Sequence, residues 1–187
     1  VVAEPRRGYG AACLAGIAGL PPVDIVAFID GDHSDYAEDL ATLVDPILSG
    51  EADFMLASRA IGAREAGSLT PQQLFGNWLA TSLIRLFWRA RFTDLGPFRA
   101  ISRPALDKLA MADRDYGWTV EMQIKAAEHG LRHGEVPARY RRRIGVSKVS
   151  GTVKGTLMAG YKILSVIGRH ALRRWLGRAG PLERAAG

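Results

Sequence analysis

The sequence predicts an α/β fold in which a mixed, mainly parallel sheet is flanked by helices. The first observation is a run of five apolar residues, Ile25–Ile29, which is too short for a helix and mostly β-branched or aromatic. Such a run is typical of a strand buried on both faces of a sheet. The second is a helical repeat of apolar residues over Leu40–Leu48, and the third is another short apolar run, Ala52–Ser58. A strand, a helix and a strand in this order predict a right-handed parallel crossover.

The elements before this unit are a strand end and a helix. Val1 and Val2 look like the end of a strand. An alanine- and glycine-rich stretch then runs from Gly8 to Gly19 and is stopped by two prolines, which is typical of a helix and its end.

The elements after the unit alternate helices and short strands. Residues 60–70 read as a loop, and a long helix follows from Pro71 to about Arg91. Its apolar and aromatic positions exceed one core-facing stripe, so they could pack in the core or form the wall of a lipid-binding groove. The later elements are a short strand at 98–101, helices at 103–112 and 118–129, a strand at 131–137, and a basic helical segment beyond Ser150.

Composition limits the class of protein and leaves several anionic partners open. The single Cys13 excludes an internal disulfide and fits a reducing compartment, and no apolar run is long enough to span a bilayer. Residues 1–131 carry 12 basic and 17 acidic side chains, whereas residues 132–187 carry 13 and 2, a balance of +11. This asymmetry indicates nucleic acid, anionic lipid or a phosphorylated substrate as a partner, or a solvated basic tail.

Three carboxylates follow the first buried strand. Asp30 and Asp32 are separated by one glycine, and Asp35 comes three residues later. Because ligands of α/β folds bind beyond the carboxyl ends of the strands, Asp30 and Asp32 are candidate ligands for Mg²⁺ or Mn²⁺. The alternative is that they only cap the next helix. Asp35 with Glu38 has the pattern of a capping box, so Asp35 is expected to be structural.

The acidic motif begins a resemblance to a known family. Asp30-Gly31-Asp32 after a hydrophobic strand resembles the Asp-x-Asp motif of nucleotide-sugar glycosyltransferases with the GT-A fold, in particular family 2 enzymes of the dolichol-phosphate mannose synthase type. Four further blocks follow in the family's order: Ala57–Arg59, Thr93–Ala100, Trp118–Glu121 and Arg143–Lys148. The resemblance covers residues 1 to about 155. It implies a GT-A domain over residues 1–150 that lacks its first, base-binding strands, followed by a basic amphipathic tail over 151–187. We therefore expect the chain to be a fragment that is inactive alone.

The resemblance also implies roles for individual residues. Asp30 and Asp32 would hold Mg²⁺ or Mn²⁺. Asp94 would lie near the reacting centre, where it would position the acceptor or the metal shell, or act as the general base if the acceptor is a hydroxyl. The residues implied in substrate binding are Arg59, Arg99, Trp118, Glu121, Arg143 and Lys148.

The implied activity is inverting transfer of a hexose from a nucleoside diphosphate sugar, of the GDP-mannose or UDP-glucose type, to a polyprenyl or dolichyl phosphate. The basic tail would place the protein on the cytoplasmic face of a membrane as a peripheral protein. The first alternative is a family 2 transferase with a saccharide or small hydroxyl acceptor. A nucleic-acid-binding module is the lower-ranked alternative, because it leaves the acidic strand end unexplained, and we expect no nucleic-acid partner.

Overall fold

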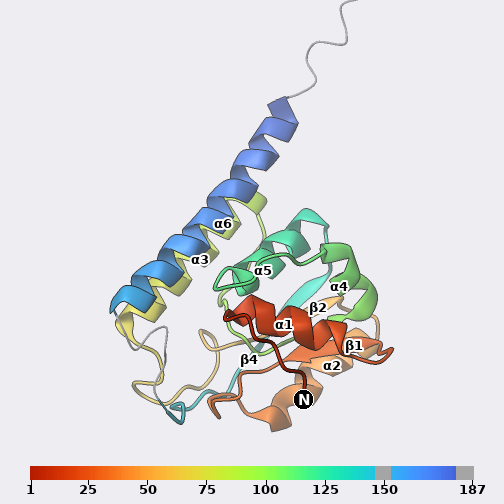
Figure 1. The fold of residues 1–187 in the computed structure, drawn as a ribbon, viewed down its shortest axis with the longest axis vertical. Coiled ribbons are helices and arrows are strands. Elements are labelled where there is room, and N and C mark those ends of the chain that lie inside the picture. Colours follow the sequence, from red (N-terminus) through yellow and green to blue (C-terminus); the bar gives the residue numbers. More distant parts are fainter. Residues whose placement is uncertain (146–152, 180–187) are drawn as a thin grey trace, which may run out of the picture.

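The computed structural model describes residues 1–145 and 153–179 (Figure 1). Within these ranges one four-stranded sheet has the order β1-β3-β2-β4. β3 runs antiparallel to β1 and β2, and β4 runs parallel to β2, so β3 alone is reversed. The α/β class with a mixed sheet is as predicted. The strands are β1 (Ile25–Phe28), β2 (Phe54–Ser58), β3 (Arg99–Ser102) and β4 (His133–Pro137).

β1 and β2 run parallel to each other, as the predicted crossover requires, but they are not neighbours in the sheet. β3 lies between β1 and β2, with Arg99 opposite Phe28 on one side and Leu56 on the other. The short run at 98–101 predicts a strand, but nothing local in the sequence indicates that it inserts between two earlier strands. Val1 and Val2 are not in a strand in the structure, so that expectation was wrong.

Helices cover both faces of the sheet. Side chains alternate along β2: Phe54 and Leu56 belong to one apolar cluster, and Met55 and Ala57 to the other. The second cluster is completed by α2 (Leu40–Leu48). The first cluster is completed by residues of α3 (Pro71–Trp88), α4 (Arg103–Leu109), α5 (Trp118–Glu128) and α6 (Val153–Ala179). Because both faces are covered, every residue of β2 is buried.

The remaining helices are α1 (Tyr9–Ala18) and a short 3-10 helix, η1 (Ala37–Asp39). The predicted capping box at Asp35 and Glu38 was wrong, because the helical turn begins only at Ala37 and no side chain caps it. Asp35 instead pairs by a backbone bridge with Tyr140 and is buried.

The helices α3 and α6 run side by side, and α6 extends beyond the rest of the molecule (Figure 1). α3 begins at a capping box formed by Thr70 and Gln73. α6 is joined to the core by buried Val166 and Ile167, and its Lys162 pairs with Asp113 at 3.1 Å. Among the described residues no helix is long and apolar enough to cross a membrane.

Candidate functional site

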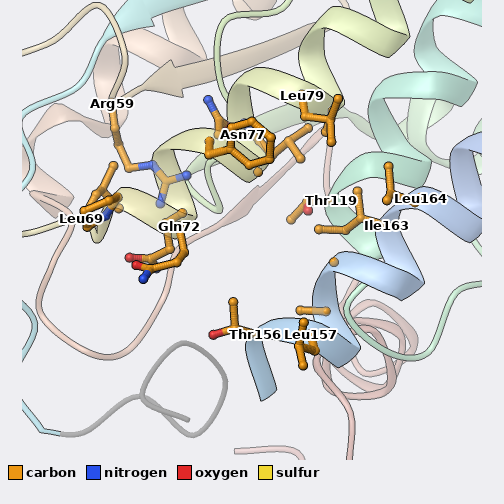
Figure 2. A pocket seen from close by; sticks show the side chains of 18 of the residues that line it. Arg59, Leu69, Gln72, Asn77, Leu79, Thr119, Thr156, Leu157, Ile163 and Leu164 are labelled. Atoms are coloured by element: carbon orange, nitrogen blue, oxygen red, sulfur yellow. The ribbon is translucent and has the colours of Figure 1, made fainter. Parts of the chain in front are cut away.

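A cavity of about 1080 Å³ opens where β1, β2 and β4 end and runs between α3 and α6 (Figure 2). Its two ends differ in chemistry. One end is lined by charged and polar side chains that follow the strands: Asp30, Asp32, Arg59, Tyr140 and Arg143. The other end is lined by apolar side chains of α3 and α6, among them Phe75, Leu79, Leu157, Ile163 and Leu164. The cavity therefore fits a molecule with a charged head and an apolar body.

Asp30 and Asp32 are both at the cavity wall and are half-buried. Burial and the nearby charge of Asp32 raise the pKa of Asp30. One oxygen of Asp32 accepts hydrogen bonds from the backbone N–H and the hydroxyl of Ser34, at 3.0 and 2.5 Å. The other oxygen of Asp32 pairs with Nη2 of Arg143 at 2.8 Å.

The donor set of these two aspartates fits a hard divalent cation. Carboxylate oxygens are the ligands that Mg²⁺ and Mn²⁺ prefer, and a cation would favour the charged form of Asp30, which burial disfavours. The described part of the chain has no group of three or more His, Cys, Asp or Glu side chains arranged to hold a metal. Two protein ligands are the usual number where a substrate phosphate supplies further oxygens.

Residues 141–144 lie across the acidic motif. The backbone N–H of Arg141 donates to Ser34 O at 3.0 Å, and that of Ile144 donates to Asp32 O at 2.9 Å. The Arg141 side chain donates to His33 O at 2.5 Å and lies 3.0 Å from its Nδ1. His33 has a left-handed backbone, with φ 68°, a conformation that is uncommon outside glycine but that histidine adopts more often than most residues. Lys148, predicted to act with Arg143, lies outside the described residues.

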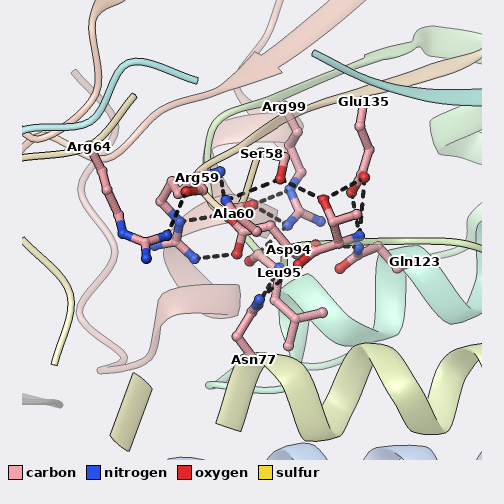
Figure 3. A network of polar contacts seen from close by, with 12 residues as sticks. Ser58, Arg59, Ala60, Arg64, Asn77, Asp94, Leu95, Arg99, Gln123 and Glu135 are labelled. Atoms are coloured by element: carbon pink, nitrogen blue, oxygen red, sulfur yellow. Dashed lines mark hydrogen bonds and ion pairs between the residues drawn. The ribbon is translucent and has the colours of Figure 1, made fainter. Parts of the chain in front are cut away.

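Arg59 and Asp94 form a buried pair at the back of the cavity (Figure 3). Arg59 donates to Asp94 from Nε at 2.7 Å, from Nη2 at 2.7 Å and from its backbone N–H at 2.8 Å. Burial alone would lower the pKa of Arg59, but the Asp94 carboxylate more than offsets this and leaves the pKa raised. Arg59 lines the cavity, whereas the side chain of Asp94 is 2% exposed and does not. Asp94 therefore holds Arg59 in place from behind.

Arg99 is also behind the cavity wall. Its guanidinium is buried and donates to the carbonyls of Leu95, Gly96 and Thr119. Burial lowers its pKa to about 10. Arg99 thus fixes the loop that carries Asp94.

Trp118 and Glu121 were expected to bind substrate, but neither side chain lines the cavity. Trp118 is fully buried, and its ring lies 6.0 Å from that of Phe28. Glu121 accepts hydrogen bonds from the backbone of Ala112 and Asp113 and pairs with Lys125 at 2.8 Å. Trp118 and Glu121 are three residues apart and share the inward face of α5, whereas Thr119 is the residue of the block Trp118–Glu121 that lines the cavity.

Several polar residues that line the cavity were not predicted from the sequence, among them Tyr9, Asn77 and Tyr140. Asn77 lies among apolar residues of a helix, where asparagine is unfavourable, and this pattern could have indicated a functional position. Asp35, expected to be a cap, is 4% exposed and its Oδ2 has no hydrogen-bond partner. Burial raises the pKa of Asp35 to about 7.

Known proteins resemble this chain in sequence and in fold, although no family model matches it. An uncharacterized glycosyltransferase of Mycobacterium tuberculosis is 38% identical over an alignment of 168 residues that covers 85% of this chain and 72% of that protein. The undecaprenyl-phosphate mannosyltransferase of Micrococcus luteus is 28% identical over 157 residues, 80% of this chain and 64% of that protein.

Among solved structures, a complex of M. tuberculosis glucosyl-3-phosphoglycerate synthase with Mn²⁺, UDP and glucosyl-3-phosphoglycerate matches with a TM-score of 0.67 and 20% identity. The match covers 89% of this chain but only 56% of that one, so the chain spans little more than half the length of this structural neighbour. The likeness places the α/β fold among those of nucleotide-sugar transferases.

Proposed function

The chain belongs to the glycosyltransferase family, and from this premise we propose that the protein transfers a hexose from a nucleoside diphosphate sugar to a polyprenyl or dolichyl phosphate, with inversion at the sugar carbon. The observation that carries the proposal is the cavity with a charged end and an apolar end. The similarity to an undecaprenyl-phosphate mannosyltransferase supports the same class of acceptor.

The donor is proposed to bind at the charged end. Asp30 and Asp32 would hold Mg²⁺ or Mn²⁺, and the metal would neutralise charge on the departing diphosphate. Mn²⁺ and UDP are bound together in the structural neighbour, which supports this choice. Arg143 contacts Asp32, so its guanidinium is placed to bind the diphosphate as negative charge develops there. Lys148 is proposed to assist from the same segment.

The acceptor is proposed to lie between Arg59 and the α3–α6 wall. The pair with Asp94 uses Nε and one terminal nitrogen of Arg59, and the guanidinium still lines the cavity, where it could bind the acceptor phosphate. The isoprenoid chain would pass along the apolar side chains of α3 and α6. A phosphate oxygen is already anionic near neutral pH, so its attack on the sugar needs no strong base.

The surface of α3 and α6 supports peripheral association with an anionic membrane. Large apolar side chains on both helices are exposed, including Phe75 at 62%, Trp78 at 61% and Trp175 at 66%. The second part of the chain has a balance of +11, and each basic residue near an anionic surface contributes about 1 kcal/mol. We propose the cytoplasmic face of a membrane as the location.

A second candidate is transfer to a small, soluble acceptor. The structural neighbour was solved with glucosyl-3-phosphoglycerate, a product whose acceptor is a small phosphorylated molecule. Arg59 could bind such a phosphate as well, but the apolar end of the cavity would then have no occupant.

The test is an assay of the complete protein with labelled nucleotide sugars, a divalent cation and a polyprenyl phosphate in anionic vesicles. We expect a lipid-linked sugar that mild acid releases, as for a glycosyl phosphate, and vesicle binding that weakens at high salt. Arg143→Ala should reduce transfer far more than vesicle binding. Arg142→Ala is the matched control, because that arginine donates to the carbonyl of Ala66 and does not line the cavity. Efficient use of a soluble acceptor, with no lipid product from any nucleotide sugar, would leave only the second candidate.

A further inference from the structure

Asn77 occupies a position in α3 that helix propensity alone would not favour. Asparagine competes for backbone hydrogen bonds and is unfavourable inside helices. It lies on the same helix as Phe75 and Leu79, which form the apolar wall, and itself lines the cavity (Figure 2). Its side-chain amide makes two hydrogen bonds outside the helix: Nδ2 donates to Thr93 O at 2.9 Å, and Oδ1 accepts from the backbone N–H of Leu95 at 2.8 Å.

These two bonds bracket Asp94, the residue that holds Arg59 (Figure 3). The amide can satisfy both partners in one orientation only. Reversed, its NH₂ group would face the N–H of Leu95 and its oxygen would face the carbonyl of Thr93. The contact therefore requires both a donor and an acceptor at this position.

Other side chains fix the same loop to different elements. Glu135 of β4 accepts from the backbone N–H and the hydroxyl of Thr93, and Gln123 of α5 donates to Asp94 O at 2.8 Å. Across the described ranges, 1–145 and 153–179, the bonds of Asn77 are those that tie this loop to α3. Asn77 is thus the polar link between the helix that carries the apolar wall and the loop that places Arg59.

We propose that Asn77 is a positioning residue that couples the seating of the acceptor's apolar chain against α3 to the placement of Arg59 at the acceptor phosphate. This inference rests on the proposed function. Contacts between a long acceptor chain and α3 would then stabilise the transition state through Arg59, in addition to holding the acceptor in the cavity. Binding energy used in this way raises kcat, whereas uniform binding lowers only KM.

The test compares a short, soluble prenyl phosphate with a long-chain polyprenyl phosphate in the complete protein. The parent should show a higher kcat with the long acceptor. Asn77→Ala should lower kcat for the long acceptor about tenfold, with little change in its KM, and should lower kcat for the short acceptor by a clearly smaller factor, so that the advantage of the long acceptor is lost. Asn77→Asp, which cannot donate to Thr93 O, should behave like the alanine variant. Ser82→Ala, an exposed change on the same helix, is the control.

Equal losses of kcat with both acceptors, or no loss with either, would overturn the inference. Amide hydrogen exchange provides a readout that needs no acceptor. In Asn77→Ala the N–H groups of Leu95 and Arg59 should exchange faster by about tenfold or more. Unchanged exchange at both amides overturns the inference even if lipid transfer is observed. Absence of transfer by the parent to either acceptor overturns the proposed function, while faster exchange would still support the Asn77 link.

Discussion

The pair formed by Arg59 and Asp94 gives the sharpest prediction about the site. Their side chains are 14% and 2% exposed, and Arg59 makes three hydrogen bonds to the carboxylate. Removing one partner of a buried pair leaves the other charge unpaired and costs about 3–5 kcal/mol. Asp94→Asn keeps an oxygen for the backbone N–H of Arg59 but loses the charge. We therefore expect it to lower the free energy of unfolding by about 3 kcal/mol.

A double-mutant cycle isolates the interaction. Arg59→Met should cost a similar amount, whereas Asp94→Asn combined with Arg59→Met should cost much less than the two losses added, with a coupling of at least about 2 kcal/mol. The measurement is urea denaturation of all four proteins at neutral pH. Losses that add to within about 0.5 kcal/mol would refute the pairing.

The same variants separate the two roles considered for Asp94. If Asp94 acts through Arg59, both single variants should lose similar kcat, and the double variant should be no worse than either, because residues that act as a unit are not additive. If Asp94 were the general base, Asp94→Asn would be far more damaging than Arg59→Met. The acid limb of the pH–rate profile would also disappear.

Two further predictions concern the carboxylates near the charged end. Asp30→Asn and Asp32→Asn should each abolish Mn²⁺-dependent binding of a nucleoside diphosphate, measured by calorimetry, while circular dichroism stays like the parent; parental binding by both variants would exclude them as ligands. Asp35 has its pKa raised to about 7 by burial, so the folded protein binds a proton that the unfolded chain releases above about pH 4. The contribution of Asp35 to stability therefore falls as pH rises from about 4 to 7, by up to about 4 kcal/mol, and Asp35→Asn should be relatively more stable at pH 8 than at pH 4; an identical pH dependence in both proteins would contradict this.

Local patterns predicted the residues that follow the strands. Asp30 and Arg59 come directly after short apolar runs, and Asp32 follows Asp30 by two residues. Parallel strands bring their carboxyl ends to one edge of a sheet. The structure places all three on one cavity, together with Arg143. These positions were predictable because the distance along the chain from strand end to site is only one to four residues.

Positions that depend on long-range packing were not predictable. Arg59 and Asp94 are 35 residues apart, and their pairing depends on the insertion of β3 between β1 and β2. The inward turn of Trp118 depends on the rotation of α5 about its axis, which the alternation of apolar and polar residues leaves ambiguous. Asp35 has the local pattern of a cap, but its bridge to Tyr140, far along the chain, overrides that pattern.

The engagement of the carboxylates bears on the choice of acceptor. A general base must reach the proton that it removes, directly or through one water. Asp94 is occupied by Arg59, and Glu121 by backbone N–H groups and Lys125. In the part of the chain that the structure describes, Asp30 and Asp32 are the acidic side chains that line the cavity. Among the described residues, the base for a hydroxyl acceptor would be one of these two, and both are proposed to hold the metal. An acceptor that arrives as a phosphate anion removes this conflict, because no side chain then has to take a proton. The geometry of the acids and the apolar end of the cavity therefore favour the same class of acceptor for independent reasons.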